Sequence, residues 1–365
     1  MGHVRADRVA ARGHQELVKS HTTMVVGAED SSAPTTATAG TGQRPRHGRH
    51  SGLFWALAKR LGQIAFVLVG VITITFSMLQ VIPGDPARLI LGKFATPESV
   101  ATLRHEMGLD LPLTTQFVNM VVALFHGDLG TSLVSRTQTV NELIGPAFAN
   151  TMSVVGFALV ISLVIGIAVG IITGIRRNDA FDRVLQAVMV ILLSTPPFMF
   201  GMVLLLVALR TKIAPAGGWH GTPVDSLKYI WLPALALSIA LTPVIARSLR
   251  QSIRETFAQD FVEAAIARGL PRHRVVLRHV LPNSLLPIVG LIGYSLGGLI
   301  GGAAVVEIVF NIPGIGSRMM AAVGSRDFPV VQGIALVSAV TVIFFNALAD
   351  AAYWIIDPRT RTAAL

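Results

Sequence analysis

Long apolar stretches alternate with short polar ones along most of the chain beyond residue 60. A helix needs about 20 mostly apolar residues to cross the hydrocarbon core of a bilayer. The pattern therefore predicts an all-α integral membrane protein with six transmembrane helices. The predicted spans are 61–82, 143–175 (with its helix from about Asn150), 184–209, 229–246, 285–306 and 330–356.

The composition agrees with a membrane protein and excludes several other classes. Charged residues make up 14% of the chain, against about 25% in soluble proteins, and the mean hydropathy is +0.63. The chain contains no cysteine. An ordinary soluble enzyme, a secreted disulfide scaffold and a wholly disordered chain are excluded.

The basic residues predict the orientation, because short cytoplasmic loops collect lysine and arginine. Most of the 30 lysines and arginines fall in 1–60, 176–183, 247–282 and 357–365, so both termini are expected in the cytoplasm of a prokaryotic cell. This bias and the attraction of anionic lipid account for the net charge of +10. A nucleic-acid partner would need a basic face interleaved with aromatic residues, and the sequence shows no such pattern.

Four regions are expected along the chain. Small polar residues at 31–42 and a basic patch at 44–49 predict a disordered cytoplasmic tail. No small-x-small cleavage site follows the first apolar stretch, so it is interpreted as an uncleaved helix; Met24 remains an alternative start. The regions are a tail (1–50), a first transmembrane helix (51–82), an extracytoplasmic loop region (83–149) and a core domain with five transmembrane helices (150–361).

The extracytoplasmic loop region contains turn signals and one clear helix start. Thr96 followed by Pro97 predicts an N-cap with proline in the first helical turn, and that helix is expected to end near Gly108. The loop is either folded on the membrane surface or a docking surface for an external partner, since it is far longer than a minimal connection.

The cytoplasmic loop 247–282 is the most informative stretch. Arg247, Arg250 and Arg254 share one face of a helix leaving the membrane, and their side chains are expected to reach lipid phosphates. Asp260 is expected to cap a short helix that ends at Gly269 in a left-handed conformation, before Pro271. The small residues at 264, 265 and 267 would let a partner's cleft approach this helix closely.

The fifth apolar stretch is rich in glycine, which lets membrane helices pack backbone to backbone. Gly297, Gly298 and Gly301 are candidates for helix packing or for lining a translocation path. Ser295 lies in a G-x-S-x-G pattern, but a serine hydrolase needs a strand–turn–helix context for it. Asp350 is expected near the inner surface, paired with a neighbouring loop arginine. No motif indicates a bound metal or nucleotide.

The cytoplasmic loop 247–282 resembles the EAA loop of permease subunits from binding-protein-dependent ABC importers. In that pattern a glycine follows the glutamate by six residues and Leu-Pro follows it by eighteen, as found here. One position differs, since His279 stands where isoleucine is usual. The matching residues, which the resemblance assigns to ATPase coupling together with Asp260, are Glu263, Ala264, Ala265, Gly269, Leu270, Arg278, Leu281 and Pro282.

Other motifs resemble the first, "B"-type, permease of dipeptide, oligopeptide and nickel importers over about residues 53–361. They include 83–86, 107–110, 127–132, Glu307 with 313–316, 326–333 and 357–359. The resemblance implies a type I ABC importer permease fold, with Glu307 among the residues of the path or its packing.

The resemblance also implies the partners. These are a second, homologous permease that completes the path, two cytoplasmic ATPases that bind ATP and Mg²⁺, an extracytoplasmic substrate-binding protein, membrane lipid and a peptide substrate. The chain itself would bind no cofactor and catalyse no reaction. Nickel chelates or glutathione remain alternative substrates. Two further classes remain as alternatives, a self-sufficient secondary transporter and an intramembrane hydrolase.

Overall fold

The computed structural model describes residues 49–81, 85–92, 95–176, 180–213, 215, 218–219 and 227–356. The predicted tail, apart from its last two residues, and the motif at 357–359 lie outside this range. The described residues form helices joined by turns, with an isolated antiparallel bridge between Thr131 and Thr139. The predicted all-α class is confirmed.

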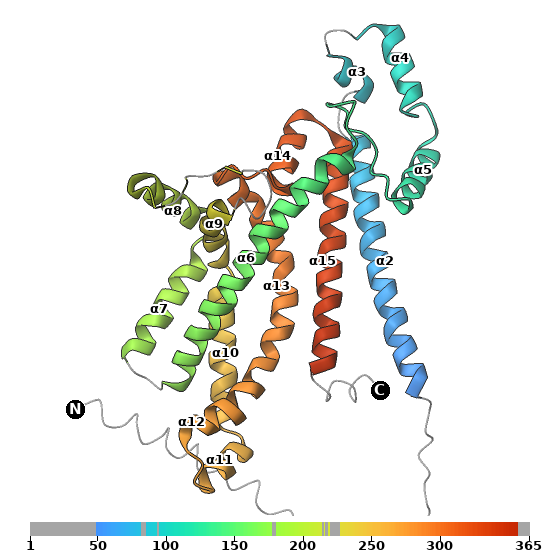
Figure 1. Ribbon diagram of the computed structural model, residues 1–365. Helices are drawn as coiled ribbons and strands as arrows, with labels where there is room; N and C mark the ends of the chain where they lie inside the picture. Colours follow the sequence, from blue (N-terminus) through green and yellow to red (C-terminus); the bar gives the residue numbers. More distant parts are fainter. Residues whose placement is uncertain are drawn as a thin grey trace, which may run out of the picture. The chain divides into compact units, whose positions relative to one another are not determined.

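The helices follow one another as Figure 1 labels them. The first half of the chain contains α2 (Arg49–Val81), α3 (Pro86–Leu91), α4 (Pro97–Glu106), α5 (Leu113–Phe125), α6 (Val140–Ile175), α7 (Ala180–Ser194) and α8 (Pro197–Thr211). The second half contains α9 (Leu227–Ser238), α10 (Thr242–Phe257), α11 (Asp260–Ala267), α12 (Arg272–Val275), the π-helix η2 (Val276–Val280), α13 (Leu281–Val309), α14 (Ile315–Ser325) and α15 (Phe328–Ile356).

Within the described residues, three helical stretches are long and apolar enough to cross a membrane. They are Val140–Ile175, Arg272–Val309 and Phe328–Ala352, and each of two bent helix pairs could add one more span. Three to five spans are therefore supported by length and composition, and the sixth stays a prediction. The second span begins at Val140 instead of near Asn150, because Thr139 and Glu142 form a capping box there.

The third and fourth predicted spans are broken. Helices α7 and α8 meet at 103°, because Pro196 and Pro197 cannot continue the hydrogen-bond ladder of α7. Helices α9 and α10 meet at 55°, with Pro243 in the first turn of α10. Helix α10 continues beyond the predicted span, which ends at residue 246, to Phe257, so Arg247, Arg250 and Arg254 do lie on a helix as expected.

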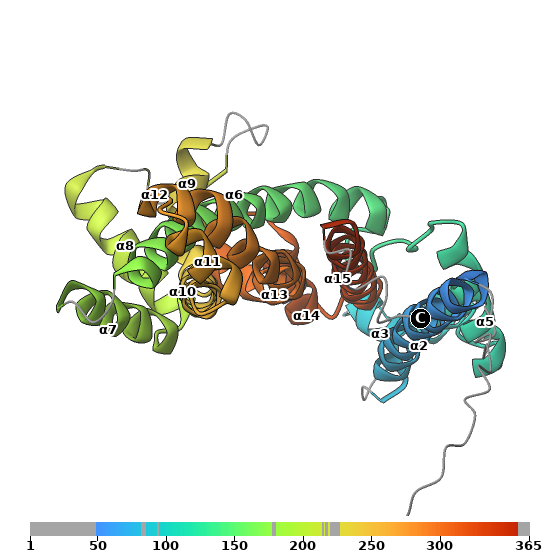
Figure 2. The ribbon, with the colours of Figure 1, turned by 90° about the horizontal axis from the view of Figure 1, so that it is seen from below.

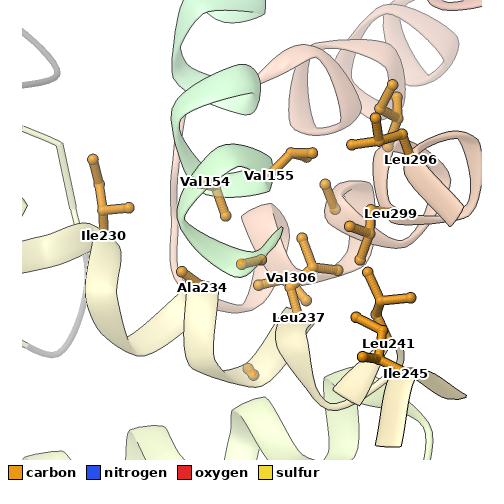
Figure 3. Close-up of a cluster of buried hydrophobic side chains, with 14 of the residues drawn as sticks. Val154, Val155, Ile230, Ala234, Leu237, Leu241, Ile245, Leu296, Leu299 and Val306 are labelled. Carbon is orange, nitrogen blue, oxygen red and sulfur yellow. The ribbon is translucent and has the colours of Figure 1, made fainter. Parts of the chain in front are cut away.

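The core lies where α6, α9, α10 and α13 meet. Figure 3 shows side chains from these helices pointing toward one another, among them Val154, Leu237, Ile245 and Val306. Close packing is the main attraction between such helices in a bilayer, since lipid tails are as apolar as the side chains.

Helices α6 and α10 share the most extensive contact among the described helices, along a line of small residues on α6. A Cβ atom added at Gly166 or Gly170 would lie 2.9 Å from the Cβ of Ile245 or Leu249, and one at Gly174 would lie 3.0 Å from Ile253. Any side chain at these glycines would push the two helices apart. We call Ser162, Gly166, Gly170 and Gly174 the α6 glycine line.

Helix α15 lies between α13 and α2 in both views (Figures 1 and 2). Helices α11 and α12 lie at one end of the bundle, and α14 lies at the other (Figure 1). We call these the α11 end and the α14 end.

Candidate functional site

Helix α11 is a short, exposed helix between α10 and α13. Its N-cap is Gln259, in an extended conformation and without a side-chain cap. The prediction that Asp260 caps the helix is therefore wrong, because the chain turns into the helix one residue earlier. Asp260 and Glu263 both lie in the first turn, where their negative charges stabilise the positive end of the helix dipole.

The other end of α11 agrees with the sequence. Gly269 has a φ of +77°, a conformation that other residues seldom adopt. The Gly269 N–H donates to the Ile266 carbonyl (2.9 Å) and the Leu270 N–H donates to the Ala265 carbonyl (3.3 Å), the bonding of a Schellman cap. The predicted helix end at Gly269 is confirmed.

The faces of α11 divide clearly. Val262 and Ala265 are buried against the bundle, whereas Phe261 and Ile266 are 45% and 56% exposed. Glu263 is exposed beside them, as are Ala264 and Ala267. Of the predicted small residues only Ala265 points inward, so the outer surface of α11 has apolar side chains with a charged neighbour. We call Phe261, Glu263, Ala264 and Ile266 the α11 surface.

The π-helix η2 joins this loop to α13. Pro282 lacks an N–H and its ring crowds the carbonyl four residues earlier, which gives a physical reason for the wide turn there. The Asn283 amide donates to the His279 carbonyl (2.7 Å), and Ser284 Oγ donates to the Val280 carbonyl (2.8 Å). Of the other predicted coupling residues, Arg278 is exposed and Leu281 is half-buried.

The loop is closed at its base. Ser284 Oγ on α13 lies 3.0 Å from Thr256 Oγ1 on α10, and both residues are buried. This contact joins α10 and α13 directly at the two ends of the loop.

Two arginines of α10 bind a buried carboxylate instead of lipid. Arg250 Nη2 and Arg254 Nη2 lie 2.9 and 3.2 Å from Asp182 Oδ2, and the Asp182 side chain is 1% exposed. Arg254 also donates to the Thr173 carbonyl on α6 (3.2 Å). The prediction that both side chains reach lipid phosphates is wrong, since a buried carboxylate needs such partners. For the exposed Arg247 it stays a prediction.

One face of α13 is left exposed along the whole helix. Residues three or four positions apart are exposed from one end of α13 to the other: Asn283, Pro287, Gly290, Tyr294, Gly298, Gly301, Val305 and Ile308. Tyr294 is 84% exposed although it lies mid-helix. We call this set the α13 open face, because no other described element covers it.

The predicted glycines divide between two faces of α13. No described atom lies within 4 Å of a Cβ built at Gly298 or Gly301, so both belong to the α13 open face. A Cβ at Gly297 would lie 3.1 Å from Val342 of α15. Ser295 lies in the middle of a continuous helix, which is not the strand–turn–helix that a hydrolase nucleophile needs.

Glu307 is buried and fully hydrogen-bonded at the α14 end. Its Oε1 accepts from Thr151 Oγ1 of α6 (2.5 Å), and its Oε2 accepts from the Gly316 and Ser317 N–H groups of α14 (2.8 and 3.1 Å). A side chain at Gly314 or Gly316 would clash with Glu307. The carboxyl group thus joins α13, α6 and the start of α14.

Asp350 of α15 forms an ion pair with Arg60 of α2. An arginine partner was expected from a loop; the structure provides it from within a helix. Among the described residues, no group of three His, Cys, Asp or Glu side chains could hold a metal ion.

The segment before α6 is fastened to the bundle. The buried carboxylate of Asp327 accepts from Ser132 Oγ and from the Leu133 N–H (3.0 Å). Helix α4 begins at the capping box of Thr96 and its last turn is followed by Gly108 at φ +62°, which confirms the predicted helix. The two interpretations of the 83–149 region remain open.

Three features of this site escaped the sequence analysis. The α6 glycine line shows the small-residue spacing that was noted only for α13. Asp182 lies 68 residues before its partner Arg250, and no local motif links the two. The third feature is the π-helix η2: Pro282 indicates an irregular helix near this position, but it does not predict a π-helix.

The comparisons with known proteins agree over nearly all of the described chain. The family described as "Binding-protein-dependent transport system inner membrane component" matches residues 166–362, and the N-terminal family of the same membrane components matches residues 53–165.

Three curated relatives illustrate the similarity. The probable D,D-dipeptide transport system permease protein DdpB of Escherichia coli is 35% identical over 84% of this chain and 97% of its own length. The dipeptide transport system permease protein DppB of Escherichia coli is 32% identical over 84% and 98%. The glutathione transport system permease protein GsiC of Salmonella choleraesuis is 36% identical over 85% and 99%.

Proposed function

The chain belongs to the family of inner-membrane components of binding-protein-dependent transport systems, and we propose that it forms half of a translocation path for peptides. The membership makes it a permease subunit of an ABC importer in the inner membrane. The substrate is proposed from the relatives, two of which are named as dipeptide permeases. Glutathione, named for a third relative, is itself a short peptide and is the alternative substrate, with nickel chelates as a more distant one.

The proposed assembly contains this chain, a second homologous permease, two cytoplasmic ATPases that bind ATP and Mg²⁺, and an external substrate-binding protein. In this arrangement α2 and the two bent pairs, α7–α8 and α9–α10, are spans as well, which gives six. Both termini and the α11 end then face the cytoplasm, as the basic loop residues favour. The α14 end and helices α3 to α5 face the binding protein.

The α11 surface is the observation that carries the proposal. An exposed helix with two apolar side chains beside a carboxylate is suited to a partner's groove, since large apolar side chains dominate interface energies. It is fixed to the bundle by Val262 and Ala265, which are buried. We assign it to contact with an ATPase, and Asp260 and Glu263 to the polar rim of that contact.

Movement of α11 is proposed to reach the path through two rigid connections. One is α10, which is locked to α6 by the α6 glycine line and to α7 by the ion pairs of Asp182. The other is η2, which leads directly into α13. The α13 open face would line the path or meet the second permease, and Gly298 and Gly301 belong to it.

The test uses two substitutions in the loop. Glu263→Lys reverses the charge on the α11 surface, and Gly269→Pro destroys the Schellman cap by removing its N–H donor. Both should abolish ATP-driven uptake of a dipeptide by the reconstituted importer while membrane insertion stays normal. Arg183→Glu on α7 is the matched control, because it reverses an exposed charge outside both the loop and the helices proposed to face the binding protein, and it should leave uptake within twofold.

The partner is tested directly with a cysteine, since the chain has none of its own. Ile266→Cys should cross-link to an ATPase subunit in native membranes, and Val262→Cys, at a buried position, should not. Normal uptake with both loop substitutions would contradict the coupling role. Uptake by the purified chain alone would instead support a self-sufficient secondary transporter.

A further inference from the structure

A cavity with both polar and apolar lining lies between α2, α13 and α15, with a volume of about 340 Å³. Its wall contains five side chains that can bind polar groups: Arg60, Gln63, Tyr294, Asn346 and Asp350. We propose that it is a transient binding site for a zwitterionic dipeptide on its way out of the path. The volume lies at the lower end of the range for small-molecule sites, about 300 to 1,000 Å³.

The charges of the cavity complement those of a free peptide. Arg60 and Asp350 pair with each other, and their side chains remain 46% and 59% exposed. An ion pair this exposed contributes little to stability, so it can exchange partners at little cost. The Arg60 guanidinium then binds the peptide carboxylate, and the Asp350 carboxylate binds the peptide ammonium group.

The pair also makes the site selective. Because the two charges cancel, a ligand with one positive and one negative end satisfies both groups. A ligand with a single charge satisfies only one of the two groups and therefore gains fewer charge-assisted hydrogen bonds.

The amides suit a peptide bond. The side chains of Gln63 and Asn346 line the same cavity as the ion pair. A carboxamide can donate to a carbonyl and accept from an N–H, which is the pairing that a peptide bond needs. A lipid acyl chain in this place would bury both amides against hydrocarbon, at a cost in free energy. The polar part of the lining therefore favours a peptide, and the apolar part, with Ile64, Val67 and Ile343, can hold its apolar side chains.

The cavity is continuous with the α13 open face. Gly290 and Tyr294 belong to both, and Tyr294 is 84% exposed. Asp350 and Arg60 lie toward the α11 end of α15 and α2, so the site lies in the half of the path nearer the ATPases. This inference rests on the proposed function, because it takes the α13 open face as part of the path.

The experiment measures dialanine binding to the complex of both permeases and both ATPases in nanodiscs, without the binding protein. Tritiated dialanine should bind, and N-acetyl-dialanine amide, which has no charge, should not compete. Asp350→Asn, which removes the charge but keeps the shape of the side chain, should raise the dissociation constant for dialanine at least tenfold. Leu348→Ala is the matched control, since Leu348 is 54% exposed on the same helix but does not line the cavity.

Several results would overturn the inference. These are no binding of dialanine to the wild-type complex, equal competition by the blocked dipeptide, or an unchanged constant in Asp350→Asn. A further one is a phosphatidylethanolamine molecule that stays bound in native mass spectrometry, is lost in Asp350→Asn and is not displaced by dialanine, which would make this a lipid site. The competition between dialanine and the blocked dipeptide is measured on the wild-type complex, so this result does not depend on whether any variant folds.

Uptake is measured on the same preparations with the binding protein restored. Uptake without direct dialanine binding would reject the cavity site and leave the proposed function standing. Absence of both ATP-driven uptake and binding would reject the proposed function itself.

Discussion

Helices α6 and α13 carry the same kind of small-residue line, but the two lines have opposite surroundings. On α6, Gly166, Gly170 and Gly174 are four positions apart and lie directly against α10. On α13, Gly298 and Gly301 lie on the α13 open face, with no described atom within 4 Å of a Cβ built there. One line has its partner within the chain, and the other does not.

The difference shows what small-residue spacing can and cannot tell. The spacing indicates that something approaches the helix backbone closely, but it does not say whether the neighbour is the same chain, a second subunit or a passing substrate. The packing of the rest of the chain decides this. Since α10 packs against the α6 glycine line, these two helices form one unit, and the α13 open face is the surface proposed to belong to the path.

The largest expected effect is on the α6 line. Gly170→Leu should prevent stable folding, because even a Cβ would lie 2.9 Å from the Leu249 Cβ and 3.0 Å from the Ala246 carbonyl. Overpacking of a core costs about 1–3 kcal/mol or more, and here it separates two helices. Thermal unfolding of the detergent-solubilised protein should show a lost or strongly lowered Tm. A wild-type Tm would mean that α6 and α10 do not touch at Gly170.

The matching change on α13 should leave the fold intact. A Cβ atom at Gly301 would meet no atom of another described element, so Gly301→Leu should change the Tm by little. Uptake should nevertheless fall at least tenfold, because the new side chain projects into the path or into the second permease. Normal uptake in this variant would show that the α13 open face contacts only lipid.

A third prediction concerns the buried face of α13. Glu307→Ala leaves the Thr151 hydroxyl and the Gly316 and Ser317 N–H groups without their acceptor. Buried polar groups left unpaired cost about 1–3 kcal/mol each, so a loss of about 3 kcal/mol or more in unfolding free energy is expected. Asp350→Ala should lose at most about 1 kcal/mol, because its ion pair is half exposed. Chemical denaturation measures both variants, and equal losses of unfolding free energy in Glu307→Ala and Asp350→Ala would contradict this prediction.

The smallest effect is expected outside both helices, after α4. His105 Nδ1 lies 2.8 Å from Asp110 Oδ2. The hydrogen bond to Asp110 and then its charge raise the pKa of His105, and the same hydrogen bond lowers the pKa of Asp110. The contact therefore stabilises this turn between the two pKa values. It is lost as the pH rises through the raised pKa of His105, or falls through the lowered pKa of Asp110.

NMR titration of the histidine ring measures this contact. Asp110→Asn should return the pKa of His105 toward its ordinary value, with no change in Tm once the pH is well above the raised pKa of His105 and the ring is neutral. The same titration curve in both proteins would show that the pair does not form in solution.

The sequence predicted those features that depend on local patterns. The end of α11 at Gly269 follows from one glycine and one proline, and α4 follows from Thr96 and Pro97. The all-α class follows from the length of the apolar stretches. Each of these depends on residues within a few positions of one another.

The missed features depend on contacts between distant segments. Asp182 and Arg250 are far apart in the sequence, and no residue near Arg250 in the sequence predicts that its side chain binds a carboxylate instead of lipid. Pro196 and Pro197 lie inside the predicted span 184–209, where prolines can break a helix. The angle of 103° between α7 and α8, in contrast, depends on how these helices pack. Likewise, the small residues of α11 gave no sign that Ala265 faces inward while Ile266 faces out.

The central claim is that the α13 open face belongs to the transport path while the α6 line is internal packing. Because the chain has no cysteine, single cysteines at Gly301 and at Ser162, which is buried on the α6 line, can be compared without background. The measurement is the rate of labelling by a membrane-impermeant maleimide in the assembled importer, with and without ATP. Gly301→Cys should be labelled at a rate that changes with ATP, and Ser162→Cys should stay unlabelled. Protection of Gly301→Cys in both states, or labelling of the two at equal rates, would contradict the account.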